Sequence, residues 1–176
     1  ATLPSANGYG VTFTSSGNAI AVAHSLSPFV SAYPWSSSGF GTKFADPATT
    51  PTGNGNGVAF NSAGTAIAVA HTTSPRISAY PWSGAGFGVK YADPATLPTG
   101  DGNGVAFNPS GNAIAVAHST SPFVSAYPFS AGFGVKYANP ATLPAGDGLS
   151  VAFNPLSTTI AVGCITAPIL HVYLFS

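Results

Sequence analysis

The sequence predicts an all-β fold built from four repeated antiparallel units. His24, His71 and His118 stand 47 residues apart, and Cys164 takes the fourth position after 46 residues. A phenylalanine, a proline and a tyrosine keep the same phase in every unit. Between these landmarks, large and small residues alternate with a period of two, as is typical of strands. The landmarks divide the chain into four units, at approximately residues 5–50, 51–97, 98–143 and 144–176.

The third unit shows the first two expected strands most clearly. A first strand at Val105–Phe107 leads into Asn108–Gly111, where proline at the second turn position and glycine at the fourth favour a type I turn. A second strand at Ala113–His118 then carries alanines on one face and larger side chains on the other. We expect these alanine faces to pack closely against larger side chains of a neighbouring unit.

Two further strands complete the predicted unit. The third covers Phe123–Tyr127, and Pro128 ends it because proline cannot donate to a strand ladder. The fourth alternates along Phe133–Tyr137. Lysines are expected on this outermost strand, where charge discourages pairing with other sheets; they are Lys43, Lys90 and Lys136. Each unit is therefore predicted to be a four-stranded antiparallel meander.

A four-stranded meander repeated every 47 residues is typical of a β-propeller blade. The stretch "VAFNPSGNAIAVAHSTSPFVSAYPF" resembles the WD40 pattern of an apolar first strand, a tight turn, a small-residue second strand and a third strand that ends in an aromatic residue. The Trp-Asp and Gly-His dipeptides of that family are absent. The resemblance implies a WD40-like propeller, either one domain over residues 1–176 or half a propeller. The repeats are also similar to repeats predicted in phage and environmental sequences.

Composition excludes several classes of function. Charged residues make up 5% of the chain and the net charge is zero, so no basic stripe for nucleic acid exists. Apolar runs are far shorter than the roughly 20 residues that span a bilayer, so no membrane span is expected. The single cysteine excludes an internal disulfide framework. A surface without Glu or Met favours an extracellular or virion location over the cytoplasm.

Candidate site residues gather at one end of the predicted blades. Strand direction places three histidines and three loop residues there: His24, His71, His118, Asn54, Asp101 and Asp147. We expect each histidine to bond the neighbouring loop, because a polar ring near burial needs a partner. Equivalent positions on different blades are too far apart to share a zinc ion, so no metal site is expected, and no cofactor is implied.

Aromatic residues end the expected third strands at the opposite end. Trp35 and Trp82 hold this position in the first two units, and Phe129 and Phe175 hold it in the others. We expect these rings to pack between blades. The alternative is that they stack on sugars.

No residue set identifies a reaction, and no catalytic residue is predicted. The first interpretation is a non-enzymatic propeller that binds a protein or glycan partner or serves as a structural module. One alternative is a multivalent glycan-binding lectin. Another is a propeller hydrolase or lactonase, which would need carboxylates or histidines pointed at one centre.

The fourth unit predicts an assembly larger than one chain. The sequence stops after the third strand of this unit, and the N-terminal "ATLP" matches only the tail that follows a fourth strand, as at 95–98. The unit also has Leu170 and Leu174 where the other units have mostly polar or smaller residues or proline, and His171 where they have a serine. We expect a homodimer that closes an eight-bladed ring or a segment of a longer repeat array, with the fourth blade partly covered by a neighbouring subunit or a missing segment.

Overall fold

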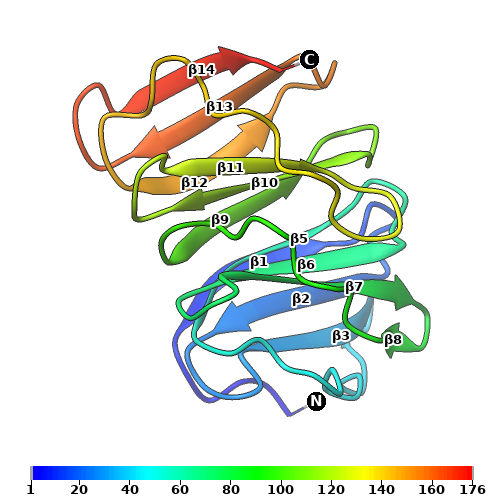
Figure 1. The fold of residues 1–176 in the computed structure, drawn as a ribbon. Coiled ribbons are helices and arrows are strands. Elements are labelled where there is room, and N and C mark those ends of the chain that lie inside the picture. Colours follow the sequence, from blue (N-terminus) through cyan, green and yellow to red (C-terminus); the bar gives the residue numbers. More distant parts are fainter. Residues whose placement is uncertain (1, 176) are drawn as a thin grey trace.

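A computed structural model describes residues 2–175; Ala1 and Ser176, the ends of the expected domain, lie outside the described residues. The chain folds into four antiparallel sheets that follow one another in sequence order (Figure 1). Between residues 2 and 175 there is no helix, and hence none that could cross a membrane. The all-β class and the blade architecture are confirmed.

Each sheet is one blade. Blade 1 contains β1 (Gly8–Phe13), β2 (Ala19–His24), β3 (Val30–Ser36) and β4 (Gly39–Phe40). Blade 2 contains β5 (Gly55–Phe60), β6 (Ala66–His71), β7 (Ile77–Ser83) and β8 (Gly86–Phe87). Blade 3 contains β9 (Gly102–Phe107), β10 (Ala113–His118) and β11 (Val124–Pro128). Blade 4 contains β12 (Gly148–Phe153), β13 (Thr159–Cys164) and β14 (Leu170–Leu174).

The blades are arranged as an open arc. The first strands lie side by side in the order β1, β5, β9 and β12, and no comparable packing joins β12 back to β1. Figure 1 shows β14 and β13 at one end of the arc and β2 and β3 toward the other. Blades 2 and 3 therefore have a neighbour on both faces, whereas blades 1 and 4 have a neighbour on one face.

The predicted hairpin between first and second strands is present. In blade 3 the Gly111 N–H donates to the Asn108 carbonyl at 2.9 Å, which closes the turn, and Gly111 has a φ of 71°. The Asn108 Oδ1 accepts from the Ala113 N–H at 2.9 Å and fixes the start of β10. The second strand has the predicted bounds, but β9 begins at Gly102, three residues earlier than expected.

Each first strand is bulged near its start, because its register shifts by one residue against the second strand. The bulge brings neighbouring first strands close together. A Cβ on Gly57 would lie 3.0 Å from the Asn103 carbonyl oxygen of the next blade, and one on Gly104 would lie 2.9 Å from that of Leu149. Glycine therefore permits the close backbone approach that joins successive blades.

The blades pack as predicted, with a small-residue face against a large-residue face. Between blades 1 and 2 the alanines of β2, with Val30 and Ala32, pack against larger side chains of blade 2; these include Val58, Ile67, Val69, Tyr80 and Trp82. Equivalent clusters join blade 2 to blade 3 and blade 3 to blade 4. The alternation read from the sequence thus produces three copies of one interface.

The third and fourth strands differ from the prediction. In blades 1 and 2 the third strand continues past Pro34 and Pro81, and the tryptophan after each proline pairs with the phenylalanine of the fourth strand. The fourth strand has only two residues in these blades, and in blade 3 it is reduced to a bridge between Phe129 and Phe133. Proline offers no N–H to extend the ladder, so the fourth strand ends early.

The lysines consequently lie beyond the fourth strands and not on them, so this part of the prediction is wrong. Lys43 pairs with Asp46, and Lys90 pairs with Asp93. Lys136 bonds the Asn139 side chain, because asparagine replaces aspartate in that repeat. These contacts lie within the segments that leave each blade for the next.

Candidate functional site

The three repeated histidines are buried side chains inside the blades. The Nε2 atom of His71 lies 3.1 Å from the Ser78 Oγ, and the other two histidines make the same contact at 3.0 Å, His24 with Ser31 and His118 with Ser125. The contact of each ring with a serine thus joins the second and third strands of its own blade. Val69 pairs with Ser78 across the ladder, so the histidine two residues further along β6 reaches that serine diagonally on the same face.

Burial determines the protonation of these rings. His71 and His118 have no exposed surface, and burial lowers the pKa of each to about 4. Burial also lowers the pKa of His24, in the end blade. The Nδ1 atom of each ring has no hydrogen-bond partner. Because His71 and His118 are inaccessible, they cannot contact a bound macromolecule, and their place fits a role in blade packing.

Blade 4 has different residues at the histidine position and at the serine position. Cys164 replaces the histidine, and its Sγ lies 3.3 Å from the Pro168 carbonyl. His171 replaces the serine, and its Nε2 accepts from the Ala145 N–H at 3.1 Å. The His–Ser contact inside the blade is thus replaced by a contact between β14 and the segment that arrives from blade 3.

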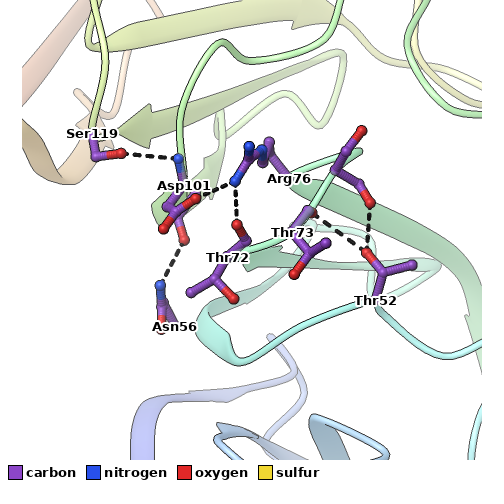
Figure 2. Close-up of polar contacts among 9 residues, drawn as sticks. Thr52, Asn56, Thr72, Thr73, Arg76, Asp101 and Ser119 are labelled. Atoms are coloured by element: carbon purple, nitrogen blue, oxygen red, sulfur yellow. Dashed lines mark hydrogen bonds and ion pairs between the residues drawn. The ribbon is translucent and has the colours of Figure 1, made fainter.

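A polar junction joins blades 2 and 3 at the loop end of the sheets (Figure 2). Arg76 pairs with Asp101 and also donates to the Thr72 carbonyl. The Asn56 side chain donates to the Gly102 carbonyl at 3.0 Å. Sequence reasoning found Asp101 but missed Arg76, because Phe29 and Phe123 stand at the equivalent positions of blades 1 and 3. The sequence signal for Arg76 was that it replaces the phenylalanine of the other two repeats.

Asp147 occupies the corresponding place between blades 3 and 4. Its carbonyl accepts from the Ile165 N–H at 3.2 Å, as the Asp101 carbonyl accepts from Ser119 at 3.1 Å. Within residues 2–175 the Asp147 side chain forms no ion pair, since Phe123 stands where Arg76 would be. Both aspartates therefore hold loops together through their backbone groups, and only Asp101 adds a charged contact.

The two tryptophans have different surroundings. Trp82 is 7% exposed and lies edge-to-face against Phe44, Phe60 and Phe87, with ring centroids 5.0–5.1 Å apart. It is a packing residue between blades 1 and 2. Trp35 is only partly buried, because its large-residue face has no preceding blade to cover it.

The candidate residues do not converge on one centre. They are spread over separate sheets, in line with their equivalent positions in successive repeats. In the part of the chain that the structure describes, no three His, Cys or Asp side chains lie close enough to hold a metal ion. The arrangement offers fixed loops and surfaces.

Each end of the arc carries exposed apolar side chains at positions that are buried in other blades. Val11 on blade 1 is 64% exposed, although its counterpart Val58 in blade 2 is 8% exposed. Leu170 on blade 4 is 60% exposed, although its counterpart Val30 in blade 1 is fully buried. We call these surfaces the blade 1 end face (Tyr9, Val11, Phe13) and the blade 4 end face (Leu170, Val172, Leu174).

Comparisons with known proteins support the fold alone. No protein-family profile and no curated protein matches the sequence. A hydrazine synthase structure from Kuenenia stuttgartiensis is similar over 95% of this chain and 46% of that one, with a TM-score of 0.72 and 11% identity. A chain of a mitotic checkpoint complex is similar over 95% of this chain and 48% of that one, with a TM-score of 0.69 and 14% identity. Both contain β-propellers, and this chain spans about half their length. The chain thus has the fold of propeller blades.

Proposed function

We propose that the chain is a non-catalytic structural module that binds a second copy of itself end to end. The observation that carries the proposal is that the two end faces are the two halves of an interface already present three times within the chain. In each internal interface, a third-strand residue of one blade belongs to the same cluster as a first-strand residue of the next: Val30 with Val58, Ile77 with Val105, and Val124 with Val151.

The same pair of positions is left without a partner at the ends. Leu170 holds the third-strand position on blade 4, and Val11 holds the first-strand position on blade 1. Both are largely exposed. Water-exposed apolar faces of this kind are costly for an isolated chain and typical of interaction surfaces. A second copy supplies both missing faces at once, because its own two ends are the complements.

Because unlike end faces meet, the copies associate head to tail. Head-to-tail association can give two different assemblies. A ring closes if two arcs together complete the turn, and the product has eight blades. An open series of copies forms if they do not. We propose the closed pair, because a propeller of eight blades is an ordinary size for this architecture.

The proposal assigns no reaction to the chain. The candidate site residues are dispersed, and the repeated histidines are buried in the blades. A lectin has less support than sequence suggested, since Trp82 is enclosed by aromatic side chains. The extracellular or virion location rests on composition alone and stays a prediction.

Charged substitutions on the two faces test the proposal. We expect Val11→Asp and Leu170→Lys each to abolish dimers when either variant is measured alone by sedimentation velocity. Mixing the two variants should restore dimers, because one interface stays unmodified and the other brings opposite charges together. Val89→Asp is the control, since Val89 is 85% exposed and lies on neither end face.

The mixing experiment distinguishes the modes of association. Restoration of dimers by mixing supports a contact between unlike faces. If Leu170→Lys alone remained dimeric, the blade 4 end face would take no part and the proposal would be wrong. A wild-type chain that stays monomeric would also contradict it.

A further inference from the structure

The outer edge of blade 4 differs from that of the other blades. In blades 1 and 2 the third strand pairs with β4 or β8, and in blade 3 a bridge at Phe133 takes the place of that strand. Among residues 2–175, no strand pairs with the outer edge of β14 (Figure 1). The backbone of this edge can therefore pair with another extended segment.

In blade 2 the phenylalanine of the fourth strand is held by aromatic rings. Phe87 lies edge-to-face against Tyr80 and Trp82, with ring centroids 5.6 and 5.1 Å away. Phe44, from the segment that arrives from blade 1, contacts the same tryptophan at 5.1 Å. The equivalent phenylalanines of blades 1 and 3 also contact two rings each. Phe40 contacts Tyr33 and Trp35, and Phe133 contacts Tyr127 and Phe129.

Blade 4 has the counterparts of all three rings. Tyr173 and Phe175 correspond to Tyr80 and Trp82, and Tyr137, from the segment that arrives from blade 3, corresponds to Phe44. Tyr137 and Phe175 lie 5.0 Å apart. Beside them is a cavity of about 710 Å³, lined by residues 171–175 and 136–142 and by side chains of β11 and β13. Blade 4 therefore has the aromatic side chains that surround a fourth-strand phenylalanine in the other blades, and a cavity lies beside them.

Blade 4 lacks a hydrogen bond that the other three blades have at the position of the cavity. In the other three blades the tyrosine hydroxyl donates to a threonine carbonyl of the arriving segment at 2.8 Å: Tyr33 to Thr2, Tyr80 to Thr49, and Tyr127 to Thr96. The Tyr173 hydroxyl has no partner, and the corresponding Thr142 lines the cavity instead. The arriving segment therefore contacts β14 at His171 but leaves the Tyr173 hydroxyl without the bond to threonine that the other blades have.

The internal fourth strands define the sequence that fits this edge. The glycine before the phenylalanine has a positive φ in each case, 90° at Gly39, 97° at Gly86 and 129° at Gly132. The glycine after it donates to the proline carbonyl of the third strand at 2.8–2.9 Å, and a Cβ there would lie 2.9–3.0 Å from that proline. In blade 4, Leu174 takes the proline's position. The fitting sequence is therefore Gly-aromatic-Gly.

We propose that the outer edge of β14, together with its cavity, binds an extended Gly-aromatic-Gly segment of a protein partner as the fourth strand of blade 4. The segment adds backbone hydrogen bonds to the edge, and its aromatic ring enters the cavity beside Tyr173 and Phe175. This binding site shares Val172 and Leu174 with the blade 4 end face, but it uses the outer edge of β14, and the buried histidines take no part in it.

A peptide copied from the chain itself tests the site. The probe is a labelled peptide of residues 83–90, "SGAGFGVK", titrated by fluorescence anisotropy. We expect saturable binding of one peptide per chain. Replacing the peptide's phenylalanine with alanine should weaken binding at least about tenfold, because the buried ring supplies most of the apolar contact.

Matched substitutions in the protein locate the binding. Ala138 is exposed and lines the cavity. Ala92 is its repeat equivalent, in the segment that runs from blade 2 to blade 3. In blade 3 the bridge at Phe133 takes the place of the fourth strand, so Ala92 serves as the matched control. Ala138→Trp should fill the cavity and weaken peptide binding at least about tenfold, whereas Ala92→Trp should leave it unchanged. Circular dichroism checks that both variants are folded.

The titration is repeated on the Val11→Asp variant, so that the site is measured whether or not the end faces associate. Equal binding to this variant supports a separate site. Absence of saturable binding would overturn the proposal, as would equal affinity for the alanine peptide. Unchanged affinity in Ala138→Trp would also overturn it.

Discussion

Blade 2 and blade 1 have nearly the same sequence but different surroundings. Blade 2 lies between two others, and no residue of its first strand β5 is exposed. Blade 1 has a neighbour on one face only, and its β1 is largely exposed. The difference shows that burial comes from the neighbouring blade and not from the repeat itself. Stability should then depend on interfaces between repeats, as expected for repeat proteins.

The largest predicted difference concerns the two tryptophans at one repeat position. Trp82→Ala should lower the free energy of unfolding by about 3–5 kcal/mol, because it removes a large side chain packed between blades. Trp35→Ala should cost less than half as much, since that ring is partly exposed. Chemical denaturation at low protein concentration compares the two. Equal losses would mean that the neighbouring blade contributes little.

Acid should destabilise the internal blades through their histidines. The pKa of His71 and of His118 is about 4 in the folded chain, below the ordinary value of 6.5. The unfolded chain therefore binds more protons between these values, so stability is full above pH 6.5 and falls as the pH drops toward 4. The loss is up to about 3 kcal/mol for each histidine.

Glutamine variants measure this effect blade by blade. His71→Gln keeps a donor for Ser78 but removes the titration, so unfolding free energy measured from pH 7 to 4 should vary less steeply. His24→Gln should flatten the curve less, because the pKa of the end-blade histidine is lowered by a smaller amount. A slope that neither substitution changes would disprove the assignment.

A glycine pair tests the close approach of blades more locally. A Cβ on Gly55 would lie 2.2 Å from the Phe29 carbonyl oxygen of blade 1, whereas one on Gly8 meets only Val22, at 3.5 Å. Gly55→Ala should therefore cost roughly 1–3 kcal/mol. Gly8→Ala should be nearly neutral in the same thermal melts. A comparable cost at both positions would argue against the interface as the cause.

The smallest effect is expected at the polar junction. Arg76→Phe introduces the residue that blades 1 and 3 already have at this position. The Arg76–Asp101 pair is partly exposed, so its loss should change the free energy of unfolding by less than about 1 kcal/mol. A loss well above this, measured by urea denaturation, would show that the junction holds blades 2 and 3 together.

The repeat made the blades, the second strands and the packing of alanine faces predictable from sequence. The hairpin at Asn108–Gly111 was also predictable, because its turn residues act locally. The fourth strands were misjudged, since the alternation around Phe133–Tyr137 continues past the point where pairing stops. Strand length there depends on the proline of the neighbouring strand, which a pattern within one segment does not contain.

The candidate site was less predictable. Equivalent residues in a repeat necessarily lie on different blades, so the repeated histidines and aspartates could not be expected to meet. The informative positions are those that break the repeat: Arg76 and His171 each change a contact between neighbouring segments, and Asn139 changes a contact within one connecting segment. The cavity beside Tyr173 depends on the spacing of two segments, and sequence alone does not specify that distance.

The mass of the chain in solution tests the central claim most directly. Light scattering during size-exclusion chromatography at micromolar concentration should give twice the chain mass of 17.4 kDa, because each end face requires a complementary partner. A single monodisperse peak at 17.4 kDa across that range would contradict the account, since both apolar end faces would then be stable in water.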